Sequence, residues 1–131
     1  MAVSQQITAD GVSMMVPEGW QQVSGENTWS PDGSALPQIG VSSAPLNDDW
    51  RPSSFLPEGG MTKSTELVLV GGGQVNMYTV QNADGTAEIH AIAHSGEMAY
   101  DYYARAASLE EVRALRPMLE QVIESATYDG M

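Results

Sequence analysis

The stretch from Thr65 to Ala126 constrains the fold more than any other part of this chain. It consists of consecutive β-type segments separated by short glycine-containing turns, and it ends in one amphipathic helix. Short turns of this kind join antiparallel neighbours. The predicted strands are Glu66–Val70, Gln74–Gln81, Thr86–His94 and Glu97–Arg105. Because Glu66–Val70 is apolar on both faces, it is predicted to be a central strand.

A helix is predicted from Ser108 to Ala126. Ser108 and Glu111 have the spacing of a capping box, in which each side chain satisfies a free backbone N–H of the first turn. Pro117 predicts a kink or break, because proline cannot donate the backbone hydrogen bond of a helix interior. One apolar stripe is predicted to pack on the sheet: Leu109, Val112, Leu115, Leu119, Val122 and Ile123.

The turns predict which side chains share a face of the sheet. A two-residue turn at Ser95-Gly96 places His90 opposite Asp101, and a turn at Asp84-Gly85 places Thr79 opposite His90. Side chains alternate along a strand, so one face becomes apolar and is predicted to lie under the helix. That predicted core face holds Ile89, Ala91, Ala93, Met98, Tyr100, Tyr102, Tyr78 and Val80.

The second face is predicted to be split between a polar end and an apolar end. The polar end holds Thr79, Gln81, Glu88, His90, Asp101 and Tyr103, and the apolar end holds Val68, Val70, Val75, Met77 and Ile92. A carboxylate beside an imidazole can orient a general base or support a metal. The alternative is an ordinary His–Asp contact on a solvated sheet face, which is the commoner case.

Composition excludes several kinds of function. The net charge is −12 with five basic residues, so the surface repels nucleic acids and anionic membranes. The chain has no cysteine, which excludes disulfides, thiol nucleophiles and cysteine-ligated metals. No segment is apolar for long enough to cross a membrane, and no signal peptide is visible. The acidic surface fits plain solubility, a basic partner, cation attraction or high salt.

The first half of the chain is less regular. A hairpin is predicted over Gln5–Val16, with its turn at Asp10-Gly11, and a strand over Leu36–Ser42. Pro45–Met61 is predicted to be a long loop, which contains Trp50 and Phe55. It would be a packed surface loop, a lid or a partner-binding loop.

The order of these signals resembles a known superfamily. The segment Gly11–Trp20 reads as a strand followed by Pro-x-Gly-Trp; strand pairs then turn at Gly72-Gly73 and Asp84-Gly85, and the closing helix ends in Val122–Ala126. This pattern resembles the PsbP-like superfamily. Its members include extrinsic photosystem II subunits, a Ran-binding nuclear transport factor, bacterial lipoproteins of the LpqN type and type VI secretion effector chaperones.

The resemblance implies an α/β fold in which an antiparallel sheet is sandwiched by helices, with mostly non-enzymatic accessory or binding roles. The chain departs from it at Pro45–Met61, where such proteins commonly have a long helix. No metal or partner residue of any subfamily is carried over.

Together these arguments predict a single α/β domain over residues 1–131, with a long C-terminal helix on one face of the sheet. Its expected function is that of a non-catalytic accessory module that binds a protein partner outside the cytoplasm, without cofactor or metal. The candidate partner-binding residues are Glu88, His90, Asp101, Tyr103, Thr79, Trp50 and Phe55.

Two alternatives to this function stay open, and the oligomeric state is not determined. One is a cytoplasmic chaperone that shields an apolar client helix in a groove of Val68, Val75, Met77 and Ile92. The other is a small enzyme in which His90 is the base and Asp101 orients it.

Overall fold

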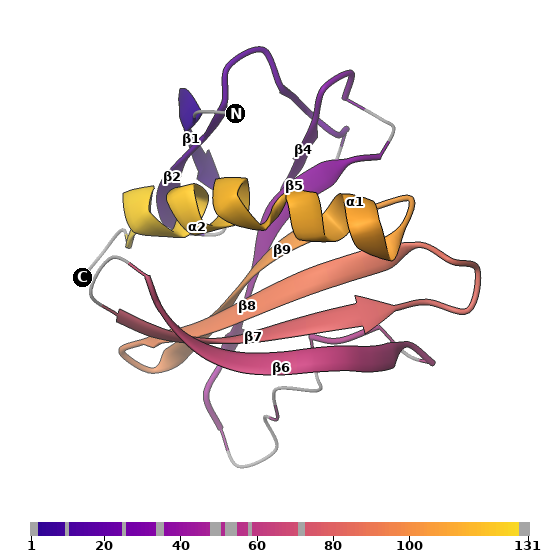
Figure 1. The fold of residues 1–131 in the computed structure, drawn as a ribbon. Coiled ribbons are helices and arrows are strands. Elements are labelled where there is room, and N and C mark those ends of the chain that lie inside the picture. Colours follow the sequence, from indigo (N-terminus) through magenta and orange to yellow (C-terminus); the bar gives the residue numbers. More distant parts are fainter. Residues whose placement is uncertain are drawn as a thin grey trace.

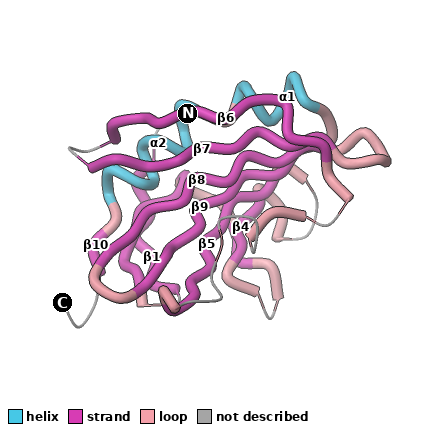
Figure 2. The backbone as a smooth tube through the Cα atoms, turned by 90° about the horizontal axis from the view of Figure 1, so that it is seen from below, coloured by secondary structure: helices cyan, strands magenta, loops and turns pink. Residues whose placement is uncertain are grey.

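The computed structural model describes residues 3–9, 11–24, 26–33, 36–47, 51, 55–57, 59–70 and 73–128. A seven-stranded antiparallel sheet dominates it, in the order β3-β4-β5-β9-β8-β7-β6 (Figures 1 and 2). The strands of this sheet are β3 (Gln21–Gln22), β4 (Thr28–Ser30), β5 (Gln38–Pro45), β6 (Met61–Val70), β7 (Gly73–Gln81), β8 (Ala87–Ser95) and β9 (Met98–Ala106).

A smaller sheet forms at the N-terminus. The strands β1 (Val3–Ala9) and β2 (Val12–Pro17) make an antiparallel hairpin, and the short β10 (Thr127–Tyr128) pairs with the other side of β2. Ile7 pairs with Met14, and Gly11 has a φ of 80°, a left-handed conformation that glycine adopts readily. The predicted N-terminal hairpin is therefore confirmed, although Asp10 lies outside the described residues.

The C-terminal region forms two short helices, α1 (Leu109–Ala114) and α2 (Arg116–Ser125). The hydroxyl of Ser108 accepts a hydrogen bond of 3.1 Å from the backbone N–H of Glu111, as the capping box predicts. Pro117 falls in the first turn of α2, where its missing N–H does no harm. The predicted break is confirmed, and the prediction of one long helix is wrong.

Both helices and the small sheet lie on one face of the large sheet (Figure 1). The core between them includes Met14, Ile39, Tyr102, Val112 and Leu119, all of which are buried. In the part of the chain that the structure describes, the opposite face carries no helix, so the expected sandwich between two helical layers is not seen. Just before β6, Gly60 lies against Val80 on this face. No helix among the described residues is both long and apolar enough to span a membrane.

The register between β8 and β9 differs from the prediction by two residues. The turn residues are Gly96 and Glu97, so Ser95 pairs with Met98 and His90 pairs with Tyr103. Gly96 has a φ of 62° and takes the first central position of the turn, which glycine favours in a two-residue hairpin. Because the shift is an even number of residues, the predicted faces of β8 and β9 are correct.

The register between β7 and β8 differs by one residue, which inverts β7. Gln81 pairs with Ala87, and Tyr78 pairs with His90. The cause is Thr86, whose N–H and hydroxyl both donate to the Asp84 carboxylate, at 3.0 Å and 2.6 Å, and which thereby joins the turn. The predicted faces are consequently wrong for Val75, Met77, Tyr78, Thr79, Val80 and Gln81.

The strand β6 lies at the edge of the sheet and not at its centre. Its ten residues pair with β7 alone within the described sheet. Leu67 and Leu69 are 64% and 73% exposed on this strand. The prediction of a central strand at Glu66–Val70 is therefore wrong, because an apolar run does not distinguish a strand buried on both faces from an unprotected edge. The strand also begins at Met61, well before the predicted start at Glu66.

Candidate functional site

Three of the predicted site residues form one compact cluster on the sheet face opposite the helices. His90, at the middle of β8, lies between two carboxylates. Its Nδ1 atom is 2.7 Å from Oδ2 of Asp101 on β9, and its Nε2 atom is 2.8 Å from Oε1 of Glu88. Glu88 and His90 share this face because they are two residues apart on one strand. Both imidazole nitrogens are thus occupied by carboxylate oxygens.

Neighbouring polar side chains hold this cluster in place. The Asn82 amide donates to Oε2 of Glu88 at 2.9 Å, and Nε of Arg105 lies 3.5 Å from Oε1. The guanidinium of Arg105 also stacks over the ring of Tyr103, 4.5 Å from its centroid. Asn82 belongs to the β7–β8 turn and Arg105 to β9, so the contacts tie three parts of the sheet together.

Burial and charge together determine the protonation of the cluster. His90 and Asp101 are each 2% exposed. Burial alone would lower the pKa of His90, but its hydrogen bonds to Asp101 and Glu88 outweigh burial and raise that pKa to about 9. For Glu88, burial acts to raise the pKa, and hydrogen bonds from His90 and Asn82 lower it to about 2. His90 is therefore an imidazolium at neutral pH and donates to both carboxylates.

Asp101 is as deeply buried as His90. Burial raises the pKa of its carboxyl, and the hydrogen bond to His90 acts in the opposite direction. Its Oδ1 atom is buried and has no hydrogen-bond partner among the described residues. Leaving a buried carboxylate oxygen without a donor is unfavourable. Substitutions that remove the remaining hydrogen bond of Asp101 should therefore lower the stability of the fold.

This geometry does not favour catalysis by His90. A general base needs a free nitrogen within reach of a substrate proton, whereas both nitrogens of His90 are bonded inside the sheet. Among the described residues, no group of three or more His, Cys, Asp or Glu side chains is arranged to hold a metal ion. The cluster is suited to joining β8 and β9 by charged hydrogen bonds.

The other predicted site residues are dispersed. Tyr103 lies beside His90, with the ring centroids 6.1 Å apart, and its hydroxyl is 2.7 Å from Oγ1 of Thr28. Thr79 is buried on the helix-facing side and does not join the cluster. Phe55 is half-buried, and Trp50 lies outside the described residues.

The groove predicted for a chaperone function is not formed. Val75, Met77 and Ile92 are all buried, and Ile92 lies on the face opposite the other two. Val68, in β6, lies on the same side of the sheet as Val75, with which it pairs. These four residues therefore cannot line one open apolar groove.

The feature that sequence reasoning missed is the edge of β6. Leu67 and Leu69 point away from the helices and are mostly exposed, which is unusual for large aliphatic side chains on an edge strand. The apolar run Leu67-Val68-Leu69-Val70 was the available signal. It allows an exposed face as readily as a buried one.

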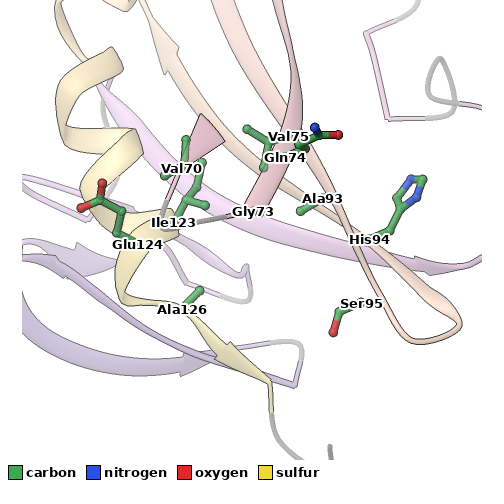
Figure 3. Close-up of a pocket in the computed structure, with 10 residues that line it drawn as sticks. All are labelled: Val70, Gly73, Gln74, Val75, Ala93, His94, Ser95, Ile123, Glu124 and Ala126. Carbon is green, nitrogen blue, oxygen red and sulfur yellow. The ribbon is translucent and has the colours of Figure 1, made fainter. Parts of the chain in front are cut away.

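A small hollow lies at the end of this edge, between β6, β7, the end of β8 and the end of α2 (Figure 3). Val70, Val75 and Ile123 form apolar walls, and Glu124 and His94 lie at opposite sides of it (Figure 3). Its volume is about 260 Å³. That is below the roughly 300 Å³ at which pockets for whole small-molecule ligands begin. The hollow therefore extends the edge and does not form a separate ligand site.

No protein-family model matches the chain, and no curated protein matches it. Solved structures do. The solution structure of cyanobacterial PsbP (CyanoP) from Synechocystis sp. PCC 6803 has a TM-score of 0.63 at 10% identity, and the match covers 98% of this chain and 94% of that one. A crystal structure from Bacteroides thetaiotaomicron VPI-5482, at 1.50 Å resolution, has a TM-score of 0.64 at 15% identity.

The match to the Bacteroides protein covers 95% of this chain and 48% of that one, so this chain spans about half its length. At these identities the likeness concerns the fold and not the activity. It agrees with the resemblance inferred from Gly11–Trp20 and the C-terminal half of the chain. The protein has a PsbP-like fold.

Proposed function

We propose that this protein is a non-catalytic binding module that acts as an accessory subunit, and that a partner docks an extended segment on the edge of β6. The observation that carries the proposal is the exposure of Leu67 and Leu69 on an edge strand. A strand added there would satisfy the outward-facing backbone groups of β6 and cover both leucines. Main-chain hydrogen bonds would supply affinity, and the leucines would supply selectivity for apolar partners.

The two halves of β6 differ in how they discourage chance pairing. Near its start the register is interrupted between Thr62 and Ser64, so Lys63 occupies a bulge. Bulges and edge lysines are the devices by which soluble proteins block unwanted strand addition. The half from Thr65 to Val70 has neither device. An edge protected at one end and open at the other is what a selective docking strand requires.

The buried cluster supports the non-catalytic part of the proposal. His90 and Asp101, the candidates for acid–base work, are buried and bonded to each other. Their position in the sheet fits a structural role. The likeness to CyanoP is compatible with an accessory module, but it concerns the fold alone.

The test is a pull-down from native lysate with three immobilised proteins: the wild type, the double variant Leu67→Lys/Leu69→Lys, and the control Met61→Lys/Thr62→Lys. The control adds the same charge to exposed positions in the protected half of the same strand. We expect the wild type and the control to retain one partner in near-stoichiometric amount and the Leu67/Leu69 variant to lose it. Equal retention by all three proteins, or no retained partner, would contradict the proposal.

A further inference from the structure

We infer that the segment that docks on β6 is a basic amphipathic strand, in which aliphatic residues alternate with lysine or arginine and the basic side chains face the helices. This inference rests on the proposed function, because it specifies the partner of the same edge. It follows from the different chemistry of the two sides of β6.

The side of β6 that faces away from the helices is apolar. Leu67 and Leu69 lie on it, two residues apart, and both are mostly exposed. Facing residues of a docked strand would lie about 5 Å away and alternate sides with the same period of two. Aliphatic side chains at every second position would therefore cover both leucines and remove them from water.

The helix-facing side of the same edge carries a carboxylate at Glu66, followed by Val68 and Val70. Glu66 lies on this side, because it pairs with Met77, which belongs to the core under the helices. The guanidinium of Arg116 donates to both Glu66 oxygens, at 3.0 Å and 2.9 Å, and its Nε lies 3.7 Å from Glu120. One cation thus serves two carboxylates.

A third carboxylate extends this acidic rim. Glu124, on α2, borders the hollow next to Val70, the last residue of β6 (Figure 3). The pKa of Glu66 is lowered by its hydrogen bond and by the charge of Arg116, so Glu66 is ionised at neutral pH. The rim formed by Glu66, Glu120 and Glu124 therefore carries an excess of negative charge over the single Arg116.

The charge pattern selects among partners. A lysine or arginine on the helix-facing side of a docked strand would meet these carboxylates, whereas an acidic residue would be repelled. The net charge of −12 would also steer a basic segment toward the protein over longer distances. The side chain of Glu66 is about half exposed even with both hydrogen bonds from Arg116 in place, so such a cation can still approach it.

A second copy of this chain is a poorer occupant of the edge. Antiparallel pairing of β6 with its own copy would bring two acidic rims onto the same side of the joined sheet. Each copy also carries a net charge of −12. Like charges brought together across paired strands are destabilising.

The inference can be tested with labelled peptides and fluorescence anisotropy. Two capped nine-residue peptides alternate valine with lysine or valine with glutamate, and a third has the lysines and valines in separate blocks. Each is titrated with the wild type, with Glu66→Gln/Glu120→Gln and with the control Glu18→Gln/Glu26→Gln, which removes the same charge at exposed positions outside β6 and the helices. The variants Leu67→Lys/Leu69→Lys and Met61→Lys/Thr62→Lys are titrated in parallel.

We expect the alternating lysine peptide to bind most tightly. Exposed ion pairs are individually weak, so loss of both Glu66 and Glu120 should weaken binding by roughly tenfold, against less than about twofold for the Glu18/Glu26 control. The block peptide should bind weakly, because net charge alone does not pair strands.

Three outcomes would overturn the inference: equal binding of the lysine and glutamate peptides, equal effects of the two glutamine pairs, or no binding of the lysine peptide. The first two would leave strand docking itself intact. If the lysine peptide bound equally to Leu67→Lys/Leu69→Lys and Met61→Lys/Thr62→Lys, the proposed docking edge would fail as well. The peptide and pull-down experiments thus separate the two claims.

Discussion

Replacing His90 with alanine should strongly destabilise the protein, because it leaves two carboxylates close together inside the sheet without their shared cation. Among the described residues, Asp101 would lose the only hydrogen bond of its Oδ2 atom, and its Oδ1 atom has none there. Removing one member of a buried ion pair is more harmful than never having had the pair, because an uncompensated charge remains.

The expected magnitude follows from two independent estimates. A rise in the pKa of His90 from 6.5 to about 9 corresponds to roughly 3 kcal/mol of preferential stabilisation of the imidazolium. Removing one partner of a buried pair in other proteins lowers the free energy of unfolding by about 3–5 kcal/mol. We therefore expect a loss of about 3–4 kcal/mol at pH 7, which is a large part of the stability of a domain of this size.

Urea denaturation followed by tryptophan fluorescence measures this change. The matched comparison is Glu88→Gln/His90→Leu/Asp101→Asn, which removes all three charges and should recover part of the lost stability. A loss below about 1 kcal/mol for His90→Ala would refute the reasoning. So would a triple variant less stable than His90→Ala, because the damage would then come from lost packing and not from unpaired charge.

Other predictions concern pH and local packing. The raised pKa of His90 stabilises the fold fully below pH 6.5, and this contribution is lost as pH rises through about 9. The lowered pKa of Glu88 contributes stability above pH 4.5, which is lost toward pH 2. Urea midpoints should therefore be highest between pH 4.5 and 6.5, and a midpoint that still rises from pH 7 to 10 would contradict this. Gly40→Ala should lower the free energy of unfolding by about 2 kcal/mol, because a Cβ there would lie 2.5 Å from the Tyr103 hydroxyl; an unchanged melting temperature would argue against that packing. Ser108→Ala should remove the cap of α1 and about 1 kcal/mol of stability in the same urea assay, whereas Ser108→Asp should retain both.

The sequence predicted the parts of the fold that depend on local chemistry. The capping box at Ser108, the break at Pro117 and the N-terminal hairpin are each encoded within a few residues. The faces of β8 and β9 were also predictable, because alternation survives a register shift of two residues. The grouping of Glu88, His90 and Asp101 was predictable for that reason.

Features that depend on one turn contact or on distant parts of the chain were not predictable in the same way. The inversion of β7 arises from one side-chain contact, between Thr86 and Asp84, which lengthens a turn by one residue. The burial of His90 and Asp101 depends on how the whole sheet is covered, and their face was taken to be solvated. The position of β6 at the edge depends on strand order, which an apolar run such as Leu67–Val70 does not reveal.

Amide hydrogen exchange on β6 tests the docking of an extended segment most directly. With the alternating lysine–valine peptide bound, the outward-facing amides between Thr65 and Val70 should exchange more slowly, because a new strand would bond to them. The amides of Met61–Ser64, in the protected half, should not change. Slower exchange confined to another part of the sheet, or an unchanged rate throughout Thr65–Val70 at saturating peptide, would contradict the account.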